Sequence, residues 1–503
     1  MLSIVAAVCL LTAQAPSPGL TARDSAFHAL YRLAYGARPG EADSVARVGV
    51  MRWIEQQLVA DHISDSRLAQ REHEFKILHY DRGDLAERFS TAQRERQRRQ
   101  REMKAGDTTN LDAVGPMREF RDLGGELQEL AIVRAAVSER QLREVMVDFW
   151  TNHFNVFVGK GADRFLLPSY IEETIRPRAL GRFEDLLIAT ARSPAMLFYL
   201  DNAQSVAAGS APPRPMMAPF RRRRFGMNEL PEDRRRRQPT GINENYAREL
   251  MELHTLGVDG GYSQADVEAL ARILTGWSLD LATGDLARFY PRRHDFSSKV
   301  FLGRTIAGSG AKELDVALDM LASHPSTARF VSRKLAMFFV ADEPGDALVA
   351  RMAQSFLDTG GDIPSTLRTM FASPEFRASL GTKFKDPLHY TLSALRLALD
   401  ERPLPDWKTA AQPVIGALAR LGEPLYARAT PDGYPLTRAD WASPGQLATR
   451  FEIARGIAYR VPLRLWDAPL GPLSASTRDT LAQAATPQEW NLLLLSSPEF
   501  MVR

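Results

Sequence analysis

The 503-residue sequence contains a single cysteine, Cys9, which lies in an apolar N-terminal segment. One cysteine cannot form an internal disulfide, and iron–sulfur centres and zinc fingers require several thiolates. Valine precedes Cys9, which argues against lipidation at this position. If the N-terminal segment is removed, the mature chain has no thiol and therefore no cysteine nucleophile.

Long apolar runs are also lacking. Beyond the N-terminus, no run approaches the roughly 20 residues that a membrane-spanning helix needs, so we expect no transmembrane span in the mature chain. Residues 2–11 are apolar and small residues follow them, which is typical of a signal peptide over residues 1–15. Because Pro16 blocks cleavage after Ala15, we place the cleavage after Ala13; a start further upstream is the alternative. The sequence thus predicts an exported protein, periplasmic or extracellular.

Several catalytic motifs are absent. The chain has no GxGxxG after a strand, no phosphate-binding loop, no GxSxG elbow and no HExxH. These absences remove sequence support for a dinucleotide enzyme, a phosphate-loop nucleotidase, an α/β-hydrolase and a zincin protease. Any catalytic site must therefore be formed by residues that do not belong to one of these motifs.

Positive charge is concentrated in two segments, although the formal net charge is only +3. Residues 91–104 carry six basic and two acidic side chains, and residues 203–240 carry nine arginines against three acidic side chains. The rest of the chain is mildly acidic. Segment 203–240 is also rich in proline and has no periodic apolar face, so we predict a disordered insertion.

The arginines of this insertion form two runs, Arg221 to Arg224 and Arg234 to Arg237. Such runs bind phosphate, a sulfated polymer or an anionic membrane surface; a solvated linker without a partner is the alternative. Only Phe220 and Phe225 are interleaved with them, whereas single-stranded nucleic acid needs aromatic stacking platforms. We therefore expect no specific nucleic acid, and an anionic polymer is the candidate partner if the insertion is more than a solvated linker.

Apolar residues recur at helical spacing through most of the chain, which predicts an all-α, multi-helical globular protein with few or no strands. We expect three helical parts, which comprise residues 20–202, 241–400 and 401–503. The insertion separates the first part from the second. Only residues 289–302 resemble short strands. A turn sequence at residues 430–435, TPDGYP, interrupts the last part, because a helix cannot contain it.

Residues 243–277 predict a helical hairpin. Asn243 is placed to cap the first helix, whose apolar face includes His254, and the Gly260–Gly261 pair closes the segment. Ser263 and Asp266 form a capping box for the second helix. Charged residues at (i, i+4) spacing, among them Arg248 and Glu252, follow the opposite side of the first helix.

The same run, ENYARELMELHTLGVDGGYSQADVEALARILTGW, resembles the signature of the bacterial domain-of-unknown-function family 1800. FWTNHF (149–154), RFEDLLIATARSPAMLFYLDN (182–202), RRHDFSSKVFLG (292–303) and HPSTARFVSRKLAMFF (324–339) resemble that family in the expected order. The resemblance extends from about residue 26 to the C-terminus. It implies an exported or envelope-associated protein and a sulfatase-like companion protein, but no particular enzyme class.

His153 and His254 each continue an apolar helical stripe, which makes them buried histidines in need of a partner. With Glu249, and with His294 and Asp295 at its mouth, they form our predicted catalytic cleft. Nitrogen and oxygen ligands of this kind suit a divalent metal such as zinc, iron or manganese, although the spacing matches no named metal motif. Satisfied core histidines are the alternative.

Four further residues are predicted to bind ligand: Asn243, Arg248, Glu252 and Lys299. His294 and Lys299 suit an anionic group, with Asp295 orienting the imidazole. Two functions remain open on the sequence. One is an exported hydrolytic or oxidative enzyme, and the other is a non-catalytic envelope or extracellular binding or assembly protein that works through its arginine-rich insertion.

Overall fold

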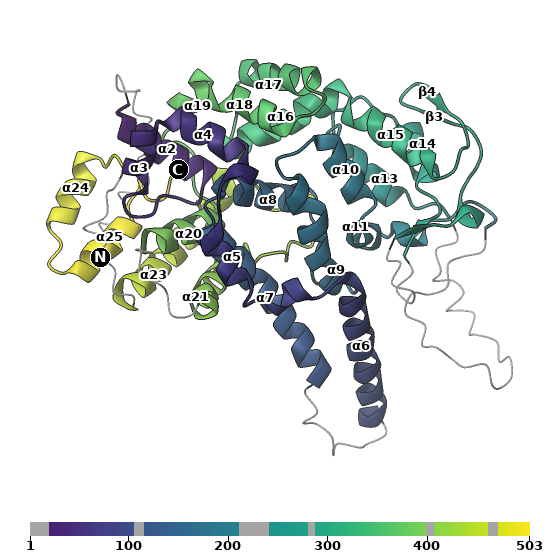
Figure 1. Ribbon diagram of the computed structural model, residues 1–503, viewed down its shortest axis with the longest axis horizontal. Helices are drawn as coiled ribbons and strands as arrows, with labels where there is room; N and C mark the ends of the chain where they lie inside the picture. Colours follow the sequence, from purple (N-terminus) through teal and green to yellow (C-terminus); the bar gives the residue numbers. More distant parts are fainter. Residues whose placement is uncertain (1–19, 105–114, 211–240, 280–286, 399–406, 461–470) are drawn as a thin grey trace.

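The computed structural model describes residues 20–104, 115–210, 241–279, 287–398, 407–460 and 471–503, and Figure 1 shows them as an elongated array of packed helices. The predicted all-α class is confirmed. The helices that come before the insertion are α2 (Ala22–Leu33), α3 (Glu41–Val48), α4 (Val50–Leu58), α5 (Ser66–Glu72), α6 (Arg82–Lys104), α7 (Gly115–Val137), α8 (Gln141–His153), α9 (Asp163–Ser169), α10 (Phe183–Ala191) and α11 (Pro194–Tyr199).

The helices after the insertion continue the same packing. They are α13 (Glu244–Glu252), α14 (Gln264–Ile273), α15 (Lys312–Ala322), α16 (Pro325–Phe339), α17 (Asp346–Asp358), α18 (Ile363–Phe371), α19 (Pro374–Ala378), α20 (Pro387–Ala398), α21 (Trp407–Arg420), α22 (Arg438–Trp441), α23 (Pro444–Arg460), α24 (Ala475–Ala482) and α25 (Pro487–Leu495). Short helical turns join several of them, including η4 (Tyr170–Ile175), a π-helix that follows α9 directly, and η6 (Asn202–Gln204).

The described strands form two small antiparallel pairs. β1 (Trp277–Ser278) pairs with β2 (Arg288–Phe289), and β3 (Lys299–Phe301) pairs with β4 (Arg304–Ile306). The sequence placed its only expected strands at residues 289–302, and β2 and β3 lie there. Each pair is only two or three residues long, so neither organises the core.

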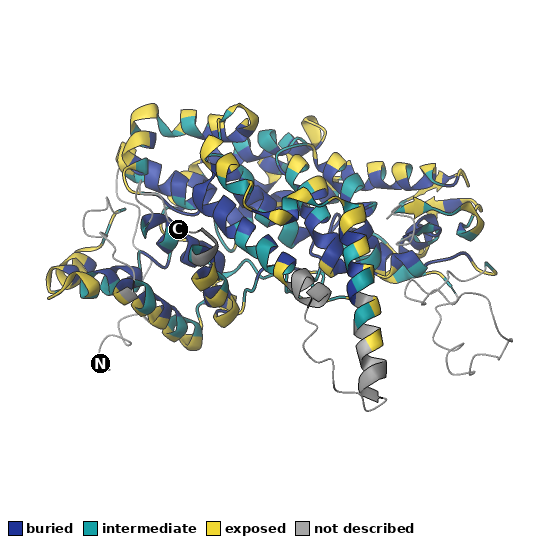
Figure 2. Ribbon diagram, turned by 60° about the horizontal axis from the view of Figure 1, so that its bottom comes forward, coloured by how far each residue is buried: buried dark blue, intermediate teal, exposed yellow. Residues whose placement is uncertain are grey.

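One hydrophobic cluster extends through most of the molecule, from Ala29 to Leu425, and a second, from Phe384 to Met501, holds the C-terminal helices. The predicted N-terminal and central parts thus share a core. Helix α20 contributes Leu392 to the first cluster and Tyr390 to the second, which connects the C-terminal part to the rest. Figure 2 shows buried residues on the inward sides of the helices and exposed residues on the outward sides.

Capping explains where the central hairpin begins. The Asn243 side chain accepts a hydrogen bond from the Asn245 N–H, and Ser263 and Asp266 form the reciprocal capping box expected from the sequence. Helix α13 ends earlier than its periodicity indicates, at Glu252. His254 therefore lies in the turn after the helix, which Gly257 closes at a positive φ of 82°.

The predicted insertion, residues 203–240, lies mostly outside the described residues. Its first residues are described up to Ser210, and they are packed against the body: Ala203 and Val206 are buried, and the Val206 N–H donates to the Gly241 carbonyl oxygen at 3.3 Å. The two ends of segment 211–240 therefore leave the fold from neighbouring points. Within the described ranges, no helix is both long and apolar enough to cross a bilayer.

Candidate functional site: an acid–base cluster around two histidines

Helix α8 carries the first histidine to the middle of the molecule. Its residues Phe149 and Trp150 are buried, and the Trp150 indole N–H donates to the Ala179 carbonyl oxygen at 3.0 Å. The helix ends at His153, whose side chain is buried among aromatic rings. Packing of this apolar stripe therefore fixes the position of the imidazole, as the sequence predicted.

His254 lies beside His153, with 6.1 Å between the ring centroids. His153 Nε2 lies 3.1 Å from the His254 carbonyl oxygen. A carbonyl oxygen only accepts, so His153 Nε2 carries the proton and Nδ1 keeps its lone pair. His153 Nδ1 and His254 Nε2 are both buried and have no hydrogen-bond partner in the described structure. The pair thus presents two unused ring nitrogens.

Burial and a nearby ammonium keep both rings neutral. The pKa of His254 is lowered to about 3, first by burial and then by the charge of Lys334. Burial, Lys334 and His254 lower the pKa of His153 in the same direction. A neutral imidazole has one donor and one acceptor nitrogen, so the free Nδ1 of His153 is an acceptor, and a bound group that forms hydrogen bonds would satisfy both free nitrogens.

Lys334, on α16, is the cation of this group. Its Nζ lies 5.7 Å from the centroid of the Phe330 ring, which itself lies against His153. Among the described residues it has no hydrogen bond or ion pair. Burial lowers the pKa of Lys334 to about 8, and the charge of Asp432 acts in the opposite direction. At pH 8 the amine is therefore present in both protonation states.

Asp432 reaches the cluster on the turn at residues 430–435, which docks on the end of α8. The Asn152 side-chain amide donates to the Tyr434 carbonyl oxygen at 2.9 Å and accepts from the Tyr434 N–H at 2.6 Å. Asn155 donates to two further carbonyl oxygens of the same segment. These amides hold the turn by its backbone, so the exposed Asp432 carboxylate, which pairs with Arg428 at 3.0 Å, comes from a distant part of the sequence to within electrostatic reach of Lys334.

Gly433 permits this close approach. Its φ is 75°, and an added Cβ would overlap the Asn152 carbonyl oxygen. Gly433→Ala is therefore expected to displace the turn and to lower the free energy of unfolding by about 1–3 kcal/mol. Urea denaturation measures this loss. Gly416→Ala in α21, where a Cβ meets no neighbour, is the control; equal behaviour of the two variants would show that the turn does not need glycine.

Three more ionisable groups adjoin the cluster. Burial, and then the charges of Glu252 and Asp432, raise the pKa of half-buried Glu249. Tyr199 lies within electrostatic reach of Glu249, Asp432 and Asp163. Asp163 is fully buried, neither carboxyl oxygen has a hydrogen-bond partner in the described structure, and burial raises its pKa to about 9. Groups with shifted pKa values concentrate at functional sites.

The structure places His294 and Asp295 in a different group. His294 Nε2 lies 2.9 Å from Glu313 Oε1 and its Nδ1 lies 2.8 Å from the Thr275 carbonyl oxygen. Asp295 pairs with Arg272 at 2.7 Å. In the described structure His294 has no hydrogen bond or ring contact with His153 or His254. The predicted cleft mouth is thus a separate buried cluster.

The predicted ligand-binding residues have structural partners as well. Lys299 pairs with buried Glu313 at 2.5 Å. Asn243 donates to the Leu200 carbonyl oxygen, Arg248 donates to Gln264, and Glu252 accepts from the Tyr262 hydroxyl. Of these four, Glu252 and Arg248 act on Glu249 in the cluster: the charge of Glu252 raises its pKa and that of Arg248 lowers it.

The predicted catalytic set therefore contributes His153, His254 and, at the edge, Glu249, while Lys334, Asp432, Tyr199 and Asp163 were missed. Three of those four lie in segments that the sequence analysis singled out: 182–202, 324–339 and the turn at 430–435. The sequence signal that could have identified Asp432 is an acidic side chain in a turn sequence that contains proline and glycine.

The expected divalent metal gains no support, since the described residues contain no group of three His, Cys, Asp or Glu side chains able to hold one.

These features define a multi-helical α-protein with a cluster of ionisable groups around two buried histidines, built from distant segments. The chain belongs to the family described as "Protein of unknown function (DUF1800)", whose model matches residues 28–502. The resemblance of the motifs is thereby confirmed over nearly the whole chain. No curated protein and no solved structure matches the chain.

Proposed function

We propose that the protein is an exported acid–base enzyme that acts on a small ligand at His153, His254 and Lys334. The observation that carries this proposal is the position of the Lys334 amine, with its pKa of about 8, beside two neutral imidazoles whose free nitrogens have no protein partner. Proton transfer is most efficient when the pKa of the group lies near the working pH.

The role of each group follows from its protonation state. The free Nδ1 of His153 accepts a hydrogen bond from a hydroxyl or amide group of the ligand, and the free Nε2 of His254 forms a second hydrogen bond, so that the two rings orient it. Lys334 gives or takes the proton at the reacting atom. Glu249, with its raised pKa, is the second proton-transfer group. Proton transfer of this kind supports hydrolysis, one of the two reaction types expected from the sequence.

Competitive acetylation with trace acetic anhydride, read residue by residue by mass spectrometry between pH 6 and 11, tests the proposal. Lys334 should label with a midpoint near pH 8, and Asp432→Asn should move the midpoint lower, because the carboxylate that favours the ammonium is lost. Lys312, exposed on α15, supplies the reference profile. A Lys334 midpoint above pH 10 would remove the basis of the proposal.

Export is the second part of the proposal, and it rests on the apolar residues 2–11. Expression of the full sequence in a bacterium should give a mature protein that begins near Gln14, in the periplasm or the medium. Intact-mass measurement of each fraction checks this result. A cytoplasmic product that retains residues 2–13 would contradict it.

A binding or assembly role remains the second candidate, with an anionic polymer or the implied sulfatase-like companion as partner. The hydrogen bond between Val206 and Gly241 brings the two ends of segment 211–240 together, so this arginine-rich segment can be deleted without stretching the fold. Its loss should abolish retention on immobilised heparin at 0.15 M salt and leave the melting temperature unchanged. Equal retention of both proteins would eliminate the polymer as partner.

A further inference from the structure

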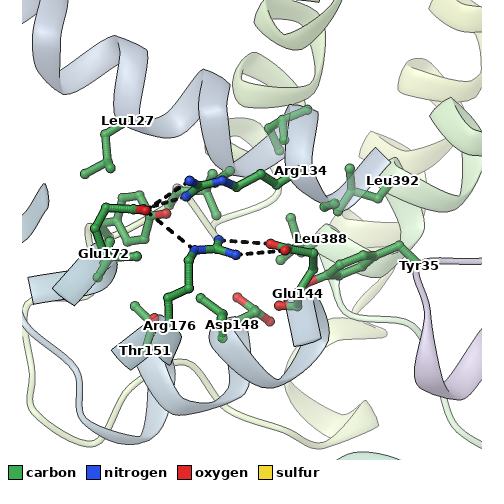
Figure 3. A pocket seen from close by; sticks show the side chains of 17 residues that line it. Tyr35, Leu127, Arg134, Glu144, Asp148, Thr151, Glu172, Arg176, Leu388 and Leu392 are labelled. Carbon is green, nitrogen blue, oxygen red and sulfur yellow. Dashed lines mark hydrogen bonds and ion pairs between the residues drawn. The ribbon is translucent and has the colours of Figure 1, made fainter. Parts of the chain in front are cut away.

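A small cavity lies on another face of α8, away from the histidines. Its volume is about 50 Å³, and its lining includes Glu144, Asp148 and Thr151 from α8. Figure 3 shows these side chains with Tyr35 on one side and the apolar side chains Leu388 and Leu392 behind. Leu127, Ala131 and Leu425 complete the apolar wall.

The two arginines at this cavity are already neutralised. Arg134 binds Glu172 with both terminal nitrogens, at 2.5 and 3.0 Å, and its Nε binds Glu72 at 2.7 Å. Arg176 binds Glu144 with both terminal nitrogens, at 2.8 and 2.9 Å. The carboxylates of Glu172, Glu72 and Glu144 therefore neutralise the two guanidinium groups. Neither arginine is then available as a counter-ion for another group in the cavity.

Asp148 is the fourth carboxyl group, and it has no hydrogen bond or ion pair with any described residue. The charges that act on it are Asp386, which opposes ionisation, and Arg503, which favours it. Arg503 is engaged by the Phe338 carbonyl oxygen, His389 and Asp386. Burial and Asp386 raise the pKa of Asp148 to about 7, so above that pH the carboxylate is present, and the cation that favours it, Arg503, is bound to other groups.

We propose that this cavity binds a small primary ammonium group, with the Asp148 carboxylate as its counter-charge. An ammonium supplies both the missing positive charge and hydrogen-bond donors for the carboxylate. The Thr151 and Tyr35 hydroxyls lie on the same lining and have acceptor lone pairs. The leucine and alanine walls favour an alkyl group on the nitrogen over a hydrated alkali ion.

The size of the cavity limits the ligand. One water needs about 10–15 Å³ of such space, so 50 Å³ accepts about three to five water-sized groups. Methylammonium and ethylammonium, with two and three heavy atoms, fit this limit. Tetramethylammonium has the same charge but no N–H donor and a larger volume, so it is the matched negative probe.

Thermal unfolding at pH 8 and constant ionic strength tests the proposal with each ammonium as its chloride. A ligand at 100 times its Kd should raise the Tm by about 2–5 °C. Methylammonium or ethylammonium should give this rise, and equal concentrations of sodium, potassium or tetramethylammonium should not. A rise of the same size with potassium, or no rise with either small amine, overturns the proposal.

Variants of individual residues show where the ammonium ion binds. Asp148→Asn should weaken binding at least tenfold, whereas Asp185→Asn, on the exposed side of α10, should not change it. Ala131→Leu fills the cavity without altering a charge and should abolish the response even if Asp148→Asn fails to fold. Lys334→Met should leave it intact, because the histidine cluster is a separate site. Persistence of the response in Ala131→Leu would place the ammonium elsewhere and reject the proposal.

Discussion

Lys334→Met is expected to lower kcat by about 10²–10⁴-fold, because under the proposed function the variant loses the group that transfers the proton at the reacting atom. The measurement needs a substrate, which a screen of esters, amides and glycosides against the wild-type protein supplies. Lys312→Met removes an exposed lysine from α15 and is the matched control. Full activity of Lys334→Met on the same substrate would show that the amine is not the proton-transfer group.

The same variant has an effect that needs no substrate. Folding lowers the pKa of Lys334 from 10.5 to about 8, so the protonated amine destabilises the folded state. This cost is fully present below pH 8 and disappears as the pH rises toward 10.5. Lys334→Met should therefore be more stable than the wild type at pH 7, and urea denaturation should show the difference shrinking between pH 8 and 10. A constant difference would mean that Lys334 is solvated in the folded protein.

Arg176→Met is expected to lower the free energy of unfolding by about 3–5 kcal/mol, because it leaves the buried Glu144 carboxylate without its bidentate partner. Glu144 is only 6% exposed, so water cannot replace the guanidinium. In the wild type, Arg176 is the largest influence that holds the pKa of Glu144 below its usual range, against the opposing effect of burial. The deficit of the variant should therefore narrow as the pH falls and the carboxyl group becomes protonated.

The double variant Arg176→Met with Glu144→Leu separates the ion pair from simple loss of packing. Replacement of a buried ion pair by apolar side chains of similar size is close to neutral. The double variant should therefore recover most of the stability lost in Arg176→Met. Guanidinium chloride denaturation of the wild type, both single variants and the double variant gives the coupling energy; additive losses would show that the two side chains do not act as a pair.

The sequence predicted the helices well because their apolar residues repeat at the helical period and their caps are explicit. Asn243, Ser263 and Asp266 act as caps as expected. It also predicted the approach of His153 and His254, since each continues an apolar stripe and lacks another partner. The end of α13 was less predictable: tertiary packing ends the helix before its periodicity ends, so His254 is held by a turn.

Residues that reach the cluster from far along the chain could not be paired from periodicity. Lys334 and Asp432 follow His153 by 181 and 279 positions, and nothing local indicates which helix or turn they will contact. His294 illustrates the opposite error. A loop histidine beside an acidic residue resembled a site, but Glu313, from a helix farther along, satisfies it in the fold.

The docking of the turn at residues 430–435 on α8 also determines when the cluster can first be completed. Asp432 comes within electrostatic reach of Lys334 and Glu249 only after some 430 residues have been made and have packed against the earlier helices. A proteolytic product or a translation intermediate that ends before this turn contains both histidines and Lys334 but lacks the backbone that Asn152 and Asn155 bind. Such a shortened chain therefore cannot assemble the complete cluster, and the cluster is finished only when the C-terminal part has folded back onto α8.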